Sequence, residues 1–380
     1  MTANKDLAFS VEEYRRRLDE VRSLMKERTL DCVILDEPEL MGWLAGYSVS
    51  ENLWRACVVP AEGPPFLLVR SLDYPPARQR SWFDDFVVFS DTDEPLETFA
   101  SAVESRGIPF QRVGVDFQSN SFTIHRYKWL QRRFADTRFL DLERSVWDLR
   151  RIKSAEEIAL FRDACSRLDE ALGLTIDSIH AGGSQREVAA SAAAAYYRLG
   201  FDDGFVGPIT VASDWDSIHG FLNDKPLEDG DIIHIELLPR LRGYSARIMR
   251  SAVVGSATRA QQKTVSTLIA LQDQQIAAMR PGVAAREVDR IVRDGVVAAG
   301  LRPDYTNITG YTLGLTPLVS QHTSDLYRCF TAEADWTLEA GMVLHMYTSA
   351  RGFAVSETVL VTAEGGERLT LAPRQLFEIQ

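Results

Sequence analysis

The chain has 380 residues, of which 45% are hydrophobic and 25% charged, so it is globular and too long for one ordinary core. Its formal net charge of −12 argues against a nucleic-acid partner, because binding to a phosphate backbone needs clustered Lys and Arg. No apolar run is long enough to cross a bilayer, and the first residues lack the apolar core of a signal peptide, so we expect a cytoplasmic protein with no membrane partner.

The first 150 residues alternate short apolar runs with amphipathic stretches. Residues 11–28 have the apolar spacing of an amphipathic helix. The other predicted helices span 101–107 and 125–134, and the predicted strands span 31–36, 55–60, 65–70, 86–89 and 113–117. Strands that alternate with helices favour an α/β first domain over residues 1–150.

The sequence pattern changes near residue 150, where a long predicted helix begins. Ser154 is predicted to be its N-cap, and Glu157 completes a capping box. We place the domain junction just before this helix, with a second domain at 151–380. Its other predicted helices span 183–200, 259–280 and 283–299, and its predicted strands lie within 231–240, 243–255 and 342–362. This order is α+β rather than a βαβ array.

Taken by themselves, few motifs in the sequence indicate a particular chemistry. No two histidines have zinc-protease spacing, and the four scattered cysteines form no CxxC pair. His234 and Glu236 alternate along one predicted strand and share a face, as do His345 and Tyr347 on a later strand. Such polar rows indicate either a buried cleft or a face wetted by solvent. His219, in a loop, is either a general base or a surface residue.

Several segments of the second half follow one another in a familiar order. They are LRRIKSAEEIALFRDAC, LEDGDIIHIELLPRLRGYSARIMRSAVVG, PGVAAREVDR, ITGYTLGL, LEAGMVLHMYTSA and SETVLVTAEGGERLT. Together they resemble the creatinase/prolidase/aminopeptidase P family, closely over the second half and by architecture over the first. The resemblance implies an α/β N-terminal domain of the creatinase type and an α+β pita-bread C-terminal domain.

Metal-using members of that family bind two metal ions with two Asp, one His and two Glu. The resemblance places the two Asp positions at Glu236 and Arg247, the His position at Tyr311, and the two Glu positions at Tyr347 and Glu357. A guanidinium and two phenols hold a hard divalent ion poorly, so we predict no metal and no cofactor. Arg247 is expected to pair with Glu236, with Glu357 or with a substrate carboxylate.

The residues at these five ligand positions resemble those of the metal-free branch of the family, which includes creatinase and ectoine hydrolase. His219 falls where creatinase-like members place a catalytic histidine, and His345 matches the ectoine hydrolase pattern. This resemblance implies hydrolysis of a C–N bond in a small polar or zwitterionic compound, such as a cyclic amidine, an amide or a guanidine-like molecule. The implied catalytic residues are His219, Glu236 and Glu357, and the implied substrate-binding residues are Arg247, Tyr311, Tyr347 and His345.

The resemblance also implies a homodimer, in which a first-domain loop caps the neighbouring site. Trp54 and Arg55 are the candidate lid residues, although Trp54 is equally compatible with a core position. Three other functions remain open. The chain could be an inactive member that binds peptides or proteins, an Xaa-Pro-type metallopeptidase with altered ligands, or a lyase on the same scaffold.

Overall fold

The computed structural model describes residues 5–380, which divide into two compact units. The first unit consists of the chain up to Arg150 together with Leu315–His322. The second consists of Arg151–Gly314 and Thr323–Gln380. The sequence interpretation placed residues 315–322 in the second domain, whereas the structure groups them with the first unit.

Polar contacts explain why the segment Leu315–His322 belongs to the first unit. Arg150 Nη2 donates to the Leu315 carbonyl at 2.7 Å. At the other end of the segment, Glu39 Oε1 lies 2.9 Å from His322 Nδ1 and accepts from the Ser320 hydroxyl. These contacts join residues far apart in the sequence, so no local pattern predicts them.

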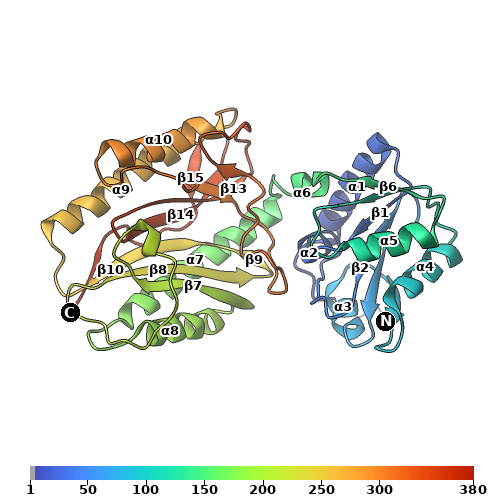
Figure 1. Ribbon diagram of the computed structural model, residues 1–380, viewed down its shortest axis with the longest axis horizontal. Helices are drawn as coiled ribbons and strands as arrows, with labels where there is room; N and C mark the ends of the chain where they lie inside the picture. The colour runs from blue at the N-terminus through green and yellow to red at the C-terminus, as the bar shows by residue number, and fades with distance from the viewer. Residues whose placement is uncertain (1–4) are drawn as a thin grey trace. The chain divides into compact units, whose positions relative to one another are not determined.

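The first unit contains a six-stranded sheet with the order β4-β3-β2-β1-β5-β6 (Figure 1). β1 pairs antiparallel with β2 and parallel with β5, so the sheet is mixed. The strands are β1 (Cys32–Leu35), β2 (Ala56–Pro60), β3 (Phe66–Arg70), β4 (Asp85–Phe89), β5 (Arg112–Val115) and β6 (Arg138–Asp141). The helices are α1 (Val11–Arg28), α2 (Pro38–Ala45), α3 (Tyr74–Arg80), α4 (Pro95–Ser105), α5 (Ile124–Arg133) and α6 (Ser145–Leu149). The predicted helix over 11–28 and the five predicted strands are confirmed; β6 was not predicted.

The core of this unit forms where the apolar strands meet α4 and α5, and Trp54 is part of it. Trp54 is 3% exposed, its ring meets Phe99 edge-on at 5.4 Å, and its Nε1 donates to Asp36 Oδ2 at 3.0 Å. Of the two interpretations of Trp54, these contacts favour the core position.

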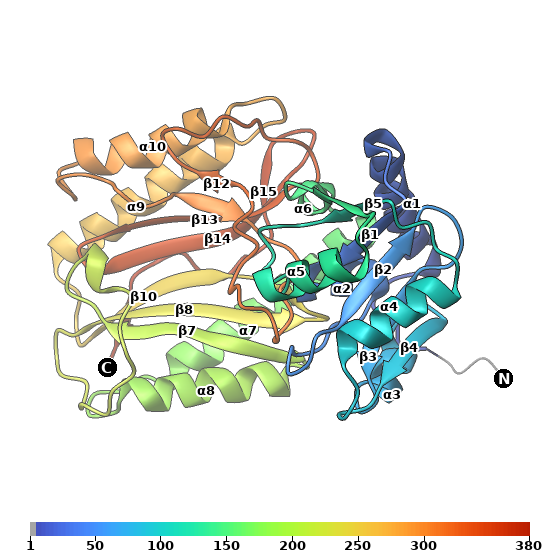
Figure 2. The same cartoon turned by 45° about the vertical axis from the view of Figure 1, so that its right-hand side comes forward.

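The second unit begins with the long helix that the sequence predicted. Ser154 caps it, and its side chain and that of Glu157 form the expected capping box. The helices are α7 (Ala155–Asp177), α8 (Gln185–Arg198), α9 (Arg259–Ala278) and α10 (Ala285–Ala298). α7 and α8 pack on β8 and β7, and α9 packs on β13 and β14 (Figure 2).

A ten-stranded sheet forms the centre of the second unit, with the main order β12-β11-β13-β14-β10-β8-β7. β15 pairs with β14, β16 with β10 and β9 with β8. The strands are β7 (Asp203–Val211), β8 (Ile232–Leu241), β9 (Tyr244–Ser245), β10 (Ile248–Val254), β11 (Gly310–Thr312), β12 (Cys329–Phe330), β13 (Val343–Ala350), β14 (Phe353–Val361), β15 (Gly366–Arg368) and β16 (Phe377–Ile379). The segment 243–255, predicted as one strand, is split into β9 and β10 at Ala246 and Arg247.

Strand register decides which side chains share a face of this sheet, because directly paired residues point to the same side. Glu236 pairs with Met249, Met249 with Ser356, and Ser356 with Tyr347. These four side chains therefore form one row across β8, β10, β14 and β13.

The next residue along each strand points to the opposite face. Met346 pairs with Glu357. Met346 packs in a hydrophobic cluster with Ile276 of α9 and Val288 of α10. Glu357 therefore points to the face that the helices cover, away from the row of Glu236 and Tyr347.

Among residues 5–380, no helix is both long enough and apolar enough to span a membrane.

Candidate functional site

A cavity of about 430 Å³ in the second unit brings together most of the polar residues that the sequence singled out. Its volume is that of a small-molecule pocket. The polar lining residues are His219, Glu236, Arg247, Asn307, Tyr311, Thr323, Ser324 and Tyr347, together with Asp216. Trp215, Ile218, Met249, Ile308 and Leu326 supply the apolar part of its wall.

Arg247 is the central contact of this cavity. Its Nη1 donates to the Tyr311 hydroxyl at 2.6 Å and to Glu236 Oε1 at 3.4 Å. Its Nη2 donates to the Thr323 carbonyl. Of the partners expected for Arg247, the structure gives Glu236 and not Glu357.

Glu236 is the buried carboxylate of the cavity wall, with only 3% of it exposed, whereas Asp216 is exposed. Burial raises its pKa, and the positive charges of Arg247 and His219 oppose that rise. A carboxyl group with a raised pKa, at a cavity that a histidine also lines, is suited to proton transfer.

His219 follows the short 3₁₀ turn η1 (Trp215–Ser217) in the loop between β7 and β8. Its side chain is exposed and lines the cavity. A positive charge on His219 opposes the rise in the pKa of Glu236. His219 is thus both exposed and at the cavity, and its role as a general base stays a prediction.

Tyr311 and Tyr347 line the cavity, and the ring of His345 packs against both of their rings. Tyr347 OH accepts from Asn307 Nδ2 at 3.4 Å. Burial raises the pKa of Tyr311 and of Tyr347, so both keep their hydroxyl protons at neutral pH. His345 is fully buried, its ring lies 5.0 Å from that of Tyr311 and 5.5 Å from that of Tyr347, and its Nε2 lies 2.7 Å from Ser356 Oγ.

These contacts correct the prediction that His345 binds substrate. It is not among the residues that line the cavity. Burial, together with the charge of Arg247, lowers its pKa well below the usual value, so the imidazole stays neutral. Its contacts are instead with the rings of Tyr311 and Tyr347 and with Ser356.

Glu357 requires a larger correction, because it faces the other side of the sheet. Arg250 Nη2 donates to its Oε1 at 3.0 Å, and Arg374 and Arg368 lie 3.3 Å and 3.6 Å away. Thr370 donates to its second oxygen. The prediction of a catalytic Glu357 is therefore wrong, and Ser356 is the residue of β14 that faces the side of Tyr347.

Trp54 and Arg55, the candidate lid residues, lie in the first unit. Arg55 is 2% exposed, and its guanidinium contacts the Val49 carbonyl at 3.1 Å, Glu51 at 3.2 Å and Ser121 Oγ at 3.2 Å. Both side chains are thus engaged inside their own unit, and capping of a neighbouring site stays a prediction.

The residues on the cavity face do not fit a dinuclear metal site. Glu236 supplies a carboxylate on this face. The other polar side chains there offer a guanidinium, two phenols and a hydroxyl, which are poor ligands for a hard divalent ion; they are Arg247, Tyr311, Tyr347 and Ser356. Arg247 places a positive charge against the Glu236 oxygen that a metal would need. Within the described part of the chain, no three His, Cys, Asp or Glu residues form a group that could hold a metal ion.

Sequence reasoning missed several cavity residues. Asn307 lies four residues before Tyr311, directly before the segment ITGYTLGL that carried the resemblance, and that position could have identified it. Thr323 and Ser324 gave no signal, because they lie in a loop that only the fold brings to Arg247.

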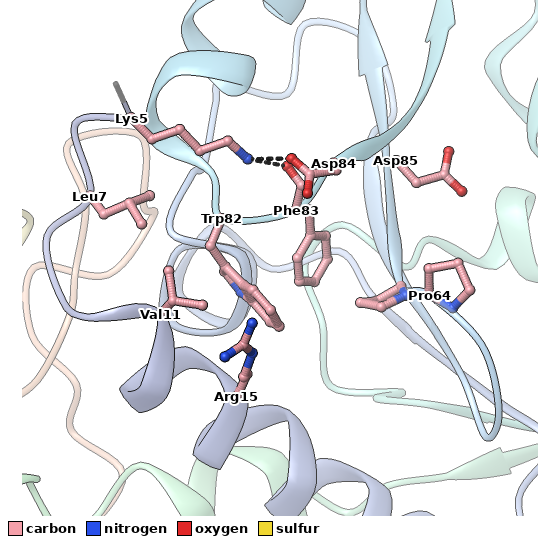
Figure 3. A pocket seen from close by; sticks show the side chains of 10 residues that line it. Lys5, Leu7, Val11, Arg15, Pro64, Trp82, Phe83, Asp84 and Asp85 are labelled. Atoms are coloured by element: carbon pink, nitrogen blue, oxygen red, sulfur yellow. Dashed lines mark hydrogen bonds and ion pairs between the residues drawn. The ribbon is translucent and has the colours of Figure 1, made fainter. Parts of the chain in front are cut away.

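A second, more open groove lies in the first unit, and Figure 3 shows its lining. Trp82 and Phe83 form its floor, and Lys5 Nζ closes one side with a 2.7 Å ion pair to Asp84. Its volume is about 790 Å³, but its ten lining residues include no histidine or cysteine and no carboxyl group that is fully buried. The cavity around Arg247 is therefore the better candidate for chemistry.

Comparisons with known proteins give two family matches and several full-length relatives. Residues 159–363 match metallopeptidase family M24, and residues 17–152 match the creatinase/prolidase N-terminal domain. The chain is 25% identical over 368 residues to an Xaa-Pro dipeptidase of Pyrococcus furiosus, which covers 96% of this chain and 100% of the relative. It is 24% identical over 402 residues to an ectoine hydrolase of Halomonas elongata, covering 98% of both.

The solved structures agree with the fold. The crystal structure of the prolidase from Pyrococcus horikoshii matches with a TM-score of 0.81 at 23% identity, covering 95% of this chain and 99% of that one. The predicted fold class, a creatinase-type N-terminal domain followed by a pita-bread domain, is confirmed.

Proposed function

This chain belongs to metallopeptidase family M24, a family of hydrolases, and we propose that it hydrolyses a C–N bond in a small polar compound without a metal ion. The observation that carries the proposal is the position of Arg247. Its guanidinium bonds to Glu236 and Tyr311 on the face where the family resemblance places metal ligands. A fixed cation there repels a divalent ion and can supply part of the electrostatic stabilisation that a metal supplies elsewhere.

The proposed reaction uses His219 and Glu236 for proton transfer. His219 takes a proton from water, and the water oxygen bonds to the carbon of the scissile C–N bond. The bond then breaks, its electron pair stays on nitrogen, and the nitrogen receives a proton from His219 or from protonated Glu236. Tyr311 and Tyr347 donate hydrogen bonds to the oxygen or nitrogen on which negative charge develops.

One alternative is an Xaa-Pro dipeptidase activity with altered ligands. The full-length similarity to an Xaa-Pro dipeptidase supports it. The donor set around Arg247 argues against it, because one carboxylate beside a guanidinium is a poor site for two divalent ions. The other alternative is binding without catalysis. It predicts no turnover of any compound, either by the wild type or by variants of His219 and Glu236.

The test is a turnover assay on metal-depleted protein in EDTA. The panel contains N-acyl amino acids, cyclic amidines, guanidino compounds and Xaa-Pro dipeptides, and amine release is quantified by chromatography. His219→Ala and Glu236→Gln should each reduce kcat/KM by about 10²–10⁴-fold while the fold stays intact. His125→Ala, which removes an exposed histidine of the first unit, is the matched control and should retain full activity.

Two outcomes would overturn the proposal. Turnover that appears only after Mn²⁺, Co²⁺ or Zn²⁺ is added would favour the metallopeptidase. Absence of turnover across the whole panel, with tight binding of a peptide in the same cavity, would favour the binding function.

A further inference from the structure

Asn307, in the loop before β11, is half-buried and lines the candidate cavity. Its Oδ1 accepts from Arg302 Nη1 at 3.0 Å, and its Nδ2 donates to the Ile308 carbonyl at 3.2 Å. The same Nδ2 donates to Tyr347 OH at 3.4 Å. The backbone carbonyl of Asn307 accepts from Arg293 Nη2 at 3.1 Å. Both the side chain and the backbone of this residue are therefore held in place.

The two ends of this amide cannot be exchanged. A guanidinium has only N–H donors, so the amide atom that faces Arg302 has to be the oxygen. A backbone carbonyl has no proton, so the amide atom that faces Ile308 has to be the nitrogen. One of the two amide protons goes to this carbonyl, and the other is available to Tyr347. The Tyr347 hydroxyl therefore accepts a hydrogen bond from Asn307 and does not donate one to it.

The proton of the Tyr347 hydroxyl is consequently left for the cavity. A phenol has one proton, and among residues 5–380 the structure gives this proton no acceptor. Burial raises the pKa of Tyr347, so the proton stays on the oxygen at neutral pH. Tyr311 is held in a similar way, because its hydroxyl accepts from Arg247 Nη1 at 2.6 Å. Both cavity hydroxyls thus accept from a protein group that cannot accept in return.

We propose that Asn307 is a positioning residue that fixes Tyr347 as a hydrogen-bond donor toward the cavity. The inference rests on the proposed function, in which this hydroxyl stabilises the negative charge that develops as the C–N compound is attacked. Arg302 sets the orientation of the Asn307 amide and does not contact the ligand. A hydroxyl whose donor direction is already set need not reorient during the reaction, and this preorganisation makes a donor effective.

A purely structural role makes a different prediction. If Asn307 only holds its loop, its replacement has the same effect on turnover whether or not position 347 carries a hydroxyl. If Asn307 acts through that hydroxyl, its replacement has little further effect once the hydroxyl has been removed. A double-mutant cycle with Tyr347→Phe separates the two roles, because it measures how far one substitution depends on the other.

Asn307→Asp is the variant for this cycle. The new carboxylate keeps the shape of the side chain and still accepts from Arg302, but it also accepts the Tyr347 proton that should face the cavity. For a compound that the wild type hydrolyses, kcat should fall about 10²-fold with little change in KM. In the Tyr347→Phe background, the same substitution should change kcat by less than about threefold. Asn52→Asp adds an equal charge at an exposed position of the first unit and should leave kcat unchanged.

A second readout needs no substrate. Tyr347 is replaced by a trifluorinated tyrosine, whose more acidic phenol can be titrated by the absorbance of its phenolate. A donor to the phenol oxygen stabilises the phenolate, so loss of the Asn307 donor should raise this pKa. Asn307→Asp and Asn307→Leu, which has a similar size and no polar atom, should each raise it by about one pH unit. The opposite polarity, in which Asn307 accepts from the hydroxyl, predicts a lower pKa in Asn307→Leu.

The two readouts separate the inference from the proposed reaction. If the wild type hydrolyses no compound in the panel, the proposed function fails, and the titration alone decides the role of Asn307. An unchanged or lowered phenol pKa in either variant would overturn the inference. Independent effects of Asn307→Asp and Tyr347→Phe on kcat would overturn it as well, even where turnover itself is found.

Discussion

Three arginine guanidinium groups surround the buried carboxylate of Glu357. Arg250 and Glu357 are both fully buried and lie 3.0 Å apart, and Arg374 and Arg368 contribute from 3.3 Å and 3.6 Å. Removing its charge leaves the buried Arg250 without compensation. Glu357→Gln should therefore lower the free energy of unfolding by about 3 kcal/mol, measured by urea denaturation of the second unit.

The control for this prediction is Glu364→Gln, which changes the same residue type in an exposed turn. Its effect should stay within about 0.5 kcal/mol. Equal stability of the two variants would show that the charge of Glu357 contributes little to stability.

Glu37, in the first unit, should make stability depend on pH. Burial raises its pKa from 4.5 to about 7, although Trp147 Nε1 donates to it at 2.7 Å. The folded state thus holds a proton that the unfolded state has lost between these two values. The stabilisation from this proton is complete below pH 4.5 and is lost as pH rises through about 7. At about 1.4 kcal/mol per pKa unit, the loss is on the order of 3 kcal/mol.

Glu37→Gln should remove this dependence, since the amide stays neutral and its oxygen can still accept from Trp147. The unfolding free energy of the first unit, measured from pH 4.5 to 8, should fall less steeply in the variant than in the wild type. Glu62→Gln, at an exposed position of the same unit, should follow the wild-type curve. A Glu37→Gln curve parallel to the wild type would mean that Glu37 titrates normally.

On β14, the sequence prediction of the site residue was off by one position. Motif order correctly assigned Glu236, Arg247, Tyr311 and Tyr347 to one cavity. It placed the last position at Glu357, but a one-residue shift along a strand moves a side chain to the other face. All residues of β14 are buried, so no alternation of apolar and polar residues marked the correct face.

At the level of elements, the irregular pairing of β7 and β8 positions Glu236. The two strands pair antiparallel with a register shift between Val206 and Ile209. Gly207 lies in that shift, and a Cβ there would lie 2.4 Å from Leu238 Cδ1 and 2.7 Å from the Glu236 carbonyl. Gly207→Ala should therefore lower the free energy of unfolding by about 1–3 kcal/mol and reduce turnover by displacing Glu236.

Gly173 provides a control of opposite sign. It is exposed inside α7, and a Cβ added to it would meet nothing within 4 Å. Gly173→Ala should stabilise the protein by about 0.5–1 kcal/mol, because alanine has the higher helix propensity. If both substitutions changed stability in the same direction, local packing at Gly207 would not be the cause.

Elements with strong local signals were predictable, and elements set by distant pairing were not. The capping box of Ser154 and Glu157 identified the start of α7 before any tertiary contact was known. β7 was missed, because its glycines and proline read as a loop and only pairing with β8 makes it a strand. The split between β9 and β10 was missed for the same reason, since Arg247 leaves the ladder to reach Tyr311 and Thr323.

At the scale of the whole molecule, ordered motifs were sufficient for the fold class, which the family comparisons confirm. They were insufficient for the membership of residues 315–322, which depends on contacts of Arg150 and Glu39 with residues more than 160 positions away. Each unit nevertheless has its own hydrophobic core: one around the β1–β2–β3 strands and others around α9, α10 and the β13–β14 pair.

Separate cores predict that charge substitutions in the two units act independently. Glu37 and Glu357 lie in different units and share no partner among the described residues. The effects of Glu37→Gln and Glu357→Gln on unfolding free energy at pH 8 should therefore add within about 0.5 kcal/mol in the double variant. Scanning calorimetry should show the first substitution raising stability at this pH and the second lowering it. A coupling energy well beyond 0.5 kcal/mol would mean that the two charged groups influence each other in the folded protein.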